Sequence, residues 1–137
     1  MIIVSACLAG VRCRYNGDAF PNEKVIELVA TGKALPVCPE QLGGLPTPRP
    51  PAEIVGERVI NTQGADITPQ FQAGAREALR LCRLAGCTKA ILKSRSPSCG
   101  YGRIYDGTFS GTLIPGDGLF ARLLRENGVE ILTEEDL

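Results

Sequence analysis

The first seven residues, MIIVSAC (1–7), decide the fold. Residues 2–6 form a short, apolar run that is rich in β-branched side chains, which is typical of a buried strand. Cys7 follows this run directly. A strand that is buried so close to the start of the chain needs partner strands and covering helices from the rest of the sequence.

Three more short apolar runs are predicted to be strands, at residues 34–37, 90–93 and 129–132. Pro36 lies within the first of these runs, which favours an edge strand or the start of a strand. Residues 39–51 contain five prolines and two glycines and are predicted to be an ordered loop. Residues 53–61 are expected to form a small β-excursion.

Helices are predicted between these strands, each with a polar cap at its start and a glycine at its stop. Proline in the first turn supports the second of them, for which the Thr68 hydroxyl is the expected cap. The predicted helices run from Asn22 to Gly32, from Thr68 to Gly86 and from Asp117 to Gly128.

Strands that alternate with helices indicate right-handed crossovers and a parallel sheet. We therefore expect residues 1–137 to form a single α/β domain. The predicted architecture is a small, three-layer, Rossmann-like domain whose mostly parallel sheet has about four to five strands.

The composition excludes several classes of protein. Lys plus Arg and Asp plus Glu each number 15, so the formal net charge is zero, whereas dedicated nucleic-acid binders usually carry a basic excess. The chain contains no histidine, which excludes His-based triads and His-containing zinc sites. No apolar run is long enough for a membrane span, and the start lacks the basic segment of a secretory signal. We expect a cytoplasmic protein with six reduced thiols.

Three cysteines are predicted to converge. Cys7, Cys38 and Cys99 each follow a predicted strand, and ligands of open parallel sheets bind at the carboxyl ends of the strands. The alternative for each thiol is a small buried hydrophobe, because free cysteine is often buried. Cys82, on the apolar face of its helix, and Cys87, at the opposite edge of the sheet, are interpreted as structural.

A carboxylate and a hydroxyl lie beside these thiols. Glu40 is two residues from Cys38, and residues two apart in an extended segment point to the same side. Ser96 and Cys99 lie within the sequence SPSCG (96–100), which is typical of a β-turn that brings the two residues close together. The alternatives are a solvated charge for Glu40 and a hydroxyl bonded to its own turn for Ser96. Cys13 stays open as a fourth ligand, a supporting thiol or a packed loop residue.

The candidate ligands are cysteine thiols, and the chain has no histidine, so only a few kinds of metal centre are possible. A zinc ribbon would need paired CxxC knuckles, which are absent. A [4Fe–4S] cluster normally takes four cysteine thiolates, so three would leave one iron with an open position. Two other hypotheses are a metal- or anion-binding module without catalysis and a purely structural packing of the thiols.

The sequence resembles the thiouracil desulfidase family of small bacterial proteins, over nearly the whole chain. The resemblance lies in three groups of short motifs. These are SACL (5–8) with CRY (13–15); CPE (38–40) with GGL (43–45) and PR (48–49); and Lys93 with SPSCG (96–100).

This resemblance implies removal of sulfur from thiouracil or 4-thiouridine, without net redox change, by a protein with a [4Fe–4S] cluster. It implies Cys7, Cys38 and Cys99 as cluster ligands, with one iron not bound by the protein, and Glu40 and Ser96 as the catalytic pair. Cys7 is preferred to Cys13 because rigid elements hold a site more accurately than loops do.

The partner implied by the resemblance is a small-molecule thiopyrimidine or a thiolated nucleoside, with tRNA as a further candidate. No DNA and no membrane are expected as partners. Arginine outnumbers lysine 11 to 4, which suits recognition of planar or phosphate groups. The candidate substrate-binding residues in the matching segments are Arg14, Tyr15, Arg49, Lys93 and Ser98.

Overall fold

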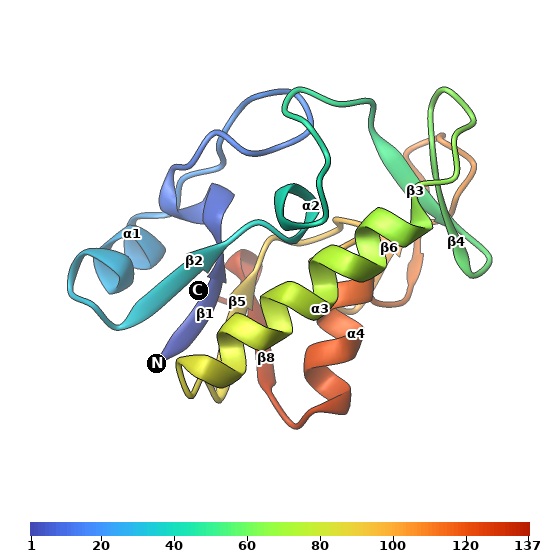
Figure 1. The fold of residues 1–137 in the computed structure, drawn as a ribbon. Coiled ribbons are helices and arrows are strands. Elements are labelled where there is room, and N and C mark those ends of the chain that lie inside the picture. The colour runs from blue at the N-terminus through green and yellow to red at the C-terminus, as the bar shows by residue number, and fades with distance from the viewer.

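A four-stranded, all-parallel sheet forms the centre of the computed structural model, which describes residues 1–137 (Figure 1). The spatial order of the strands is β2-β1-β5-β8. This architecture confirms the predicted α/β class and the parallel sheet. The strands are β1 (Ile2–Ser5), β2 (Ala34–Val37), β5 (Lys89–Leu92) and β8 (Glu130–Thr133).

The predicted strands occur within a residue or so of their expected bounds. Because β1 lies between β2 and β5, it is covered on both sides by neighbouring strands and carries the buried side chains of Ile3 and Val4. β2 is an edge strand, and this position tolerates Pro36, which cannot donate a backbone hydrogen bond.

Helices cover both faces of the sheet and make three layers. One core cluster joins the sheet to α3 (Thr68–Leu84) and α4 (Leu119–Glu126), and α3 runs across the sheet in Figure 1. A second cluster joins the other face to α1 (Glu23–Ala30) through Val25. Apolar side chains on both faces of the same strands explain why the first run of the sequence is apolar without alternation.

One of the three predicted helix caps is confirmed. The side-chain oxygen of Asn22 accepts hydrogen bonds from the backbone N–H groups of Lys24 and Val25, at 3.0 and 3.2 Å. The helix that follows ends before Thr31, and Gly32 adopts a left-handed φ of 73° just after it. This is the start and stop pattern that the sequence predicted.

The expected capping roles of Thr68 and Asp117 are wrong. The buried Thr68 is itself the first residue of α3, and its hydroxyl donates to Asp66 at 2.6 Å and accepts from the N–H of Val59 at 2.7 Å. Asp117 accepts instead from the N–H of Gly102 at 2.9 Å, while the residue after it precedes α4. The Thr68 side chain is thus used by the segment before its helix. Asp117 also pairs with Arg125 of α4 at 3.1 Å, but it caps no N–H group of that helix.

The prediction of a loop without regular structure over residues 39–51 is partly wrong. A single helical turn, α2 (Pro39–Leu42), begins directly after β2. Its end approaches α3 so closely that a Cβ on Gly43 would collide with the backbone of Gln70. Proline in the first turn is compatible with a helix start, so the proline content of this stretch concealed the short helix.

Two antiparallel hairpins lie beyond the sheet. The expected β-excursion is the hairpin of β3 (Ala52–Val55) and β4 (Arg58–Asn61). A second hairpin, β6 (Arg103–Tyr105) with β7 (Leu113–Pro115), was not predicted. None of the helices is both long enough and apolar enough to cross a membrane.

Candidate functional site

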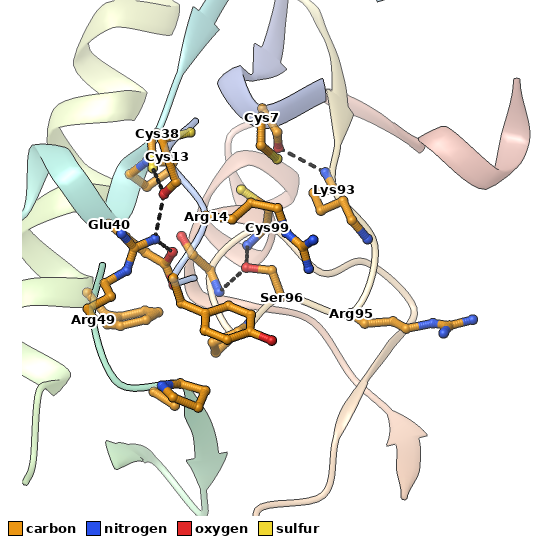
Figure 2. A pocket seen from close by; sticks show the side chains of 18 of the residues that line it. Cys7, Cys13, Arg14, Cys38, Glu40, Arg49, Lys93, Arg95, Ser96 and Cys99 are labelled. Carbon is orange, nitrogen blue, oxygen red and sulfur yellow. Dashed lines mark hydrogen bonds and ion pairs between the residues drawn. The ribbon is translucent and has the colours of Figure 1, made fainter. Parts of the chain in front are cut away.

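A cavity of about 830 Å³ lies beyond the carboxyl ends of β1, β2 and β5. Its lining includes all five residues for which a ligand or catalytic role was expected, and Figure 2 shows them around one space. The residues are Cys7, Cys38, Glu40, Ser96 and Cys99. The topology of the sheet therefore brings together side chains that are up to 92 positions apart in the sequence.

Cys7 lies in a short 3₁₀ turn, η1 (Ala6–Ala9), that follows β1. The hydroxyl of Ser5 accepts a hydrogen bond from the N–H of Lys93 at 2.9 Å and so ties the end of β1 to the end of β5. Burial, assisted by the neighbouring Cys38, raises the pKa of Cys7 to about 11. The thiol is thus held in a turn that directly follows this tied strand end, and a bound cation would be needed to favour its thiolate.

Cys38 is the residue immediately before α2. Cys13 lies beside Cys38. The Sγ of Cys38 is 3.8 Å from the carbonyl oxygen of Cys13. A hydrogen bond from the Cys13 thiol and another from the backbone N–H of Gln41 together outweigh burial and lower the pKa of Cys38 to about 7. The same hydrogen bond raises the pKa of Cys13. Within this pair, the thiolate is therefore favoured at Cys38 rather than at Cys13.

Cys99 lies in the turn that the SPSCG sequence predicted. The Oγ of Ser96 accepts hydrogen bonds from the N–H groups of Ser98 and Cys99, both at 3.0 Å, and the N–H of Gly100 donates to the carbonyl oxygen of Ser96 at 2.8 Å. Burial raises the pKa of Cys99. The hydroxyl of Ser96 thus both organises the turn and faces the cavity.

Glu40 forms an ion pair with Arg49, which is only 8% exposed. The alternative of a solvated loop charge is therefore wrong for Glu40. The guanidinium of Arg49 also donates to the carbonyl oxygens of Cys13 and Pro46, at 2.9 and 3.2 Å, and to the hydroxyl of Thr47 at 3.0 Å. The guanidinium of Arg49 donates hydrogen bonds to groups of the protein itself. In this structure Arg49 therefore positions Glu40 and the loop that contains Cys13.

The other basic candidates meet at an aromatic side chain. The guanidinium of Arg14 lies 5.6 Å from the ring centre of Phe20 and 5.7 Å from that of Tyr15, and the ammonium of Lys93 lies 4.4 Å from the ring of Phe20. Lys93 also pairs with Glu134 at 3.3 Å, whereas Arg14 has no carboxylate partner. Arg14 is the cation of this group that is available to a ligand.

Ser98 supplies an unusual feature of the cavity wall. It is only 1% exposed, and its Oγ makes no hydrogen bond within the protein. An orphaned buried hydroxyl is costly unless a ligand satisfies it.

The thiols suit a bound group larger than one metal ion. No three Cys, Asp or Glu side chains lie close enough together to hold a single metal ion. A zinc ion would need its thiolates about 2.3 Å away, whereas three thiols around a larger cavity match the donor set of an iron–sulfur cluster. The residues present, including the unsatisfied hydroxyl of Ser98, therefore fit a [4Fe–4S] cluster.

Sequence reasoning missed several residues of the cavity. Glu134 follows β8 directly, and its carboxylate accepts from the N–H and hydroxyl of Ser94 at 2.6 and 2.7 Å. Burial raises the pKa of Glu134, but these hydrogen bonds and Lys93 outweigh burial and leave the pKa below its usual value. The position after a strand could have identified Glu134, as it identified the cysteines. No local signal marked Phe109, which comes from the unpredicted hairpin.

Comparison with known proteins identifies the family of the chain. The family model described as 2-thiouracil desulfurase matches residues 2–136. The chain is 43% identical over 147 aligned positions to the uncharacterized protein YbbK of Bacillus subtilis (strain 168), covering 100% of this chain and 97% of that protein. It is 48% identical to a solved structure named [4Fe-4S]-dependent thiouracil desulfidase TudS, with a TM-score of 0.94 and coverage of 99% and 91% of the two chains. The chain therefore belongs to the 2-thiouracil desulfurase family.

Proposed function

We propose that this chain, acting as one domain over residues 1–137, is a [4Fe–4S]-dependent desulfidase of small thiopyrimidines. The reaction is hydrolytic and involves no net redox change: the C=S group and water give C=O and hydrogen sulfide. Family membership supports this proposal. The observation that carries it is the convergence of three thiols, a carboxylate and a hydroxyl on one cavity.

The ligands we assign to the cluster are Cys7, Cys38 and Cys99, so that one iron has no protein ligand. Cys13 is left out because its thiol hydrogen-bonds to Cys38 and supports the thiolate of that ligand. When bound, the cluster supplies a thiophilic Lewis acid for the sulfur of the substrate.

Glu40 is assigned as the base. Arg49 bonds one carboxylate oxygen, Oε2, and no protein group donates to Oε1, so Oε1 is free to accept a proton from the attacking water. The ion pair with a buried guanidinium also fixes the direction of the carboxylate, because Arg49 is itself held by three other acceptors.

Ser96 is assigned as a donor. Its oxygen already accepts two backbone N–H groups, which occupies both lone pairs and leaves the O–H hydrogen free. Ser96 therefore orients the substrate or delivers a proton to it, and it does not act as a base.

The remaining candidates are assigned to substrate binding. Arg14, without a carboxylate partner, suits the carbonyl oxygen that a thiouracil retains, and Lys93 adds positive charge where sulfur leaves as an anion. Tyr15 and Ser98 line the same cavity, and Arg49 acts through Glu40. Thiolated nucleosides are included in the proposed substrate class. Six free cysteines suit the reducing cytoplasm.

The test uses wild-type protein that is reconstituted and assayed without oxygen. We expect about four irons per chain and release of sulfide from 2-thiouracil, with formation of uracil. A panel of 2-thiouracil, 4-thiouridine and thiolated tRNA identifies the substrate class. Protein that carries its cluster but releases no sulfide from any of the three would overturn the proposal, and activity on tRNA alone would overturn the small-molecule class.

A further inference from the structure

Phe109 has an unusual backbone conformation at the edge of the candidate site. It lies in the turn between β6 and β7, lines the cavity and keeps 40% of its surface exposed. Its φ is 56°, in the left-handed region that residues with a Cβ rarely adopt. Glycine or asparagine would adopt this φ at lower cost, so the backbone gives no reason for phenylalanine here.

Hydrogen bonds from both hairpins hold this turn in place. One carboxylate oxygen of Glu53, on β3, accepts from the N–H groups of Gly107 and Phe109 at 3.0 and 3.2 Å. Within the turn, Thr108 donates to Asp106 at 2.6 Å, and its hydroxyl lies 2.6 Å from that of Ser110. The surrounding structure therefore imposes the strained conformation, as is typical of functional positions.

The ring of Phe109 differs from the other exposed rings of the cavity. Tyr15 and Phe20 each lie beneath a cationic side chain, whereas no cation covers Phe109. An exposed aromatic ring on a rigid turn offers an apolar platform for a flat, π-bonded partner. The proposed substrates contain such a ring.

We propose that Phe109 stacks on the heteroaromatic ring of the substrate and makes the site selective for planar pyrimidines. The inference rests on the proposed function, because a thiopyrimidine supplies the ring. It extends that function by naming a specificity residue outside the sheet, on the β6–β7 hairpin.

The experiment measures binding, so that it does not depend on turnover. Calorimetry on the reconstituted protein compares uracil with 5,6-dihydrouracil, which has the same carbonyl groups but lacks the aromatic ring. In Phe109→Gly we expect uracil to bind about tenfold more weakly and dihydrouracil to bind within about twofold of wild type. Phe109→Tyr should restore uracil binding. The melting temperature of Phe109→Gly should equal or exceed that of wild type, because glycine relieves the strained φ.

Ile114→Ala is the matched control, since Ile114 lies on the same hairpin, is 41% exposed and does not line the cavity. It should leave both affinities unchanged. Equal weakening of the two ligands in Phe109→Gly, or unchanged uracil binding, would refute the stacking role. Wild-type protein that binds uracil but releases no sulfide from 2-thiouracil would refute the proposed function and leave the result on Phe109 standing.

Discussion

Two groups of free thiols lie at opposite ends of the sheet. The strand-end cysteines, Cys7, Cys38 and Cys99, line the cavity. The core cysteines, Cys82 and Cys87, do not line it and lie in the cluster between the sheet and α3, which also includes Cys99. Burial alone does not separate the two groups, because Cys82 and Cys7 are both buried and burial raises both of their pKa values to about 11.

Their surroundings separate them. The core cysteines pack among aliphatic side chains, and the Sγ of Cys82 lies 3.5 Å from the carbonyl oxygen of Cys87. The strand-end cysteines are accompanied by Glu40, Arg14 and Lys93, and the hydrogen bond from Cys13 lowers the pKa of one of them, Cys38, to about 7. A thiol beyond the carboxyl ends of the parallel strands is therefore close to charged groups and to the cavity, whereas a thiol in the core is enclosed mainly by hydrocarbon.

The largest expected effect comes from removing a strand-end thiol. Cys38→Ser should lose the cluster and all measurable sulfide release, because two cysteines do not hold it firmly. Iron content and visible absorbance after anaerobic reconstitution measure the loss. The matched control, Cys82→Ala, should keep about four irons per chain. Iron loss in both variants would abolish the distinction between the two groups.

Glu40→Gln tests the base while preserving the shape of the site. Glutamine can still accept from Arg49, whereas alanine would leave a buried guanidinium without its partner. We expect kcat to fall by about 10²- to 10⁴-fold, the usual contribution of general base catalysis. Iron content and visible absorbance should match wild type. A variant that loses its cluster would show that Glu40 is structural.

Cys13→Ser tests whether Cys13 is a cluster ligand, like the strand-end cysteines, or only supports Cys38. If Cys13 only supports Cys38, the variant keeps its iron, and kcat falls by less than about tenfold, because a serine hydroxyl can also donate a hydrogen bond. Iron analysis and steady-state kinetics on one preparation measure both quantities. A loss of iron as complete as in Cys38→Ser would make Cys13 a ligand.

Glu134, at the cavity end of the sheet, is expected to make the free energy of unfolding depend on pH. Its pKa is lower in the folded protein than the ordinary value, so its contribution to stability is complete above the unfolded pKa of about 4.3 and is lost as the pH falls below it. Glu134→Gln should lower the free energy of unfolding by about 1–2 kcal/mol at pH 7. Urea titrations at pH 7 and pH 3 should show this difference shrinking in acid, whereas a constant difference would contradict the pKa shift.

The smallest expected effect is on the core cysteines. Cys87→Ala removes a sulfur from hydrocarbon surroundings, so we expect a loss of about 1 kcal/mol in the free energy of unfolding and unchanged kcat and KM. Urea unfolding of the reconstituted protein and the sulfide assay provide the two measurements. A kinetic defect in the fully folded variant would extend the functional group of thiols beyond the strand ends.

Residues near in sequence were predicted more successfully than residues that meet only in space. The Asn22 cap and the turn from Ser96 to Cys99 depend on atoms two or three positions apart, and both occur as expected. Thr68 and Asp117 carried the same kind of local signal, but more distant segments compete for their side chains. A capping signal is thus reliable only where no neighbouring element takes the hydroxyl or carboxylate.

The sequence by itself determined the alternation of strands and helices and the placing of Cys7, Cys38 and Cys99 at strand ends, because apolar periodicity and caps are local properties. Only the tertiary structure decided that Arg49 reaches Cys13, 36 positions away, and that Glu53 holds Phe109, 56 positions away. Those contacts depend on how the hairpins and α2 dock beyond the sheet. Docking reflects the packing of whole elements, which no short stretch of sequence specifies.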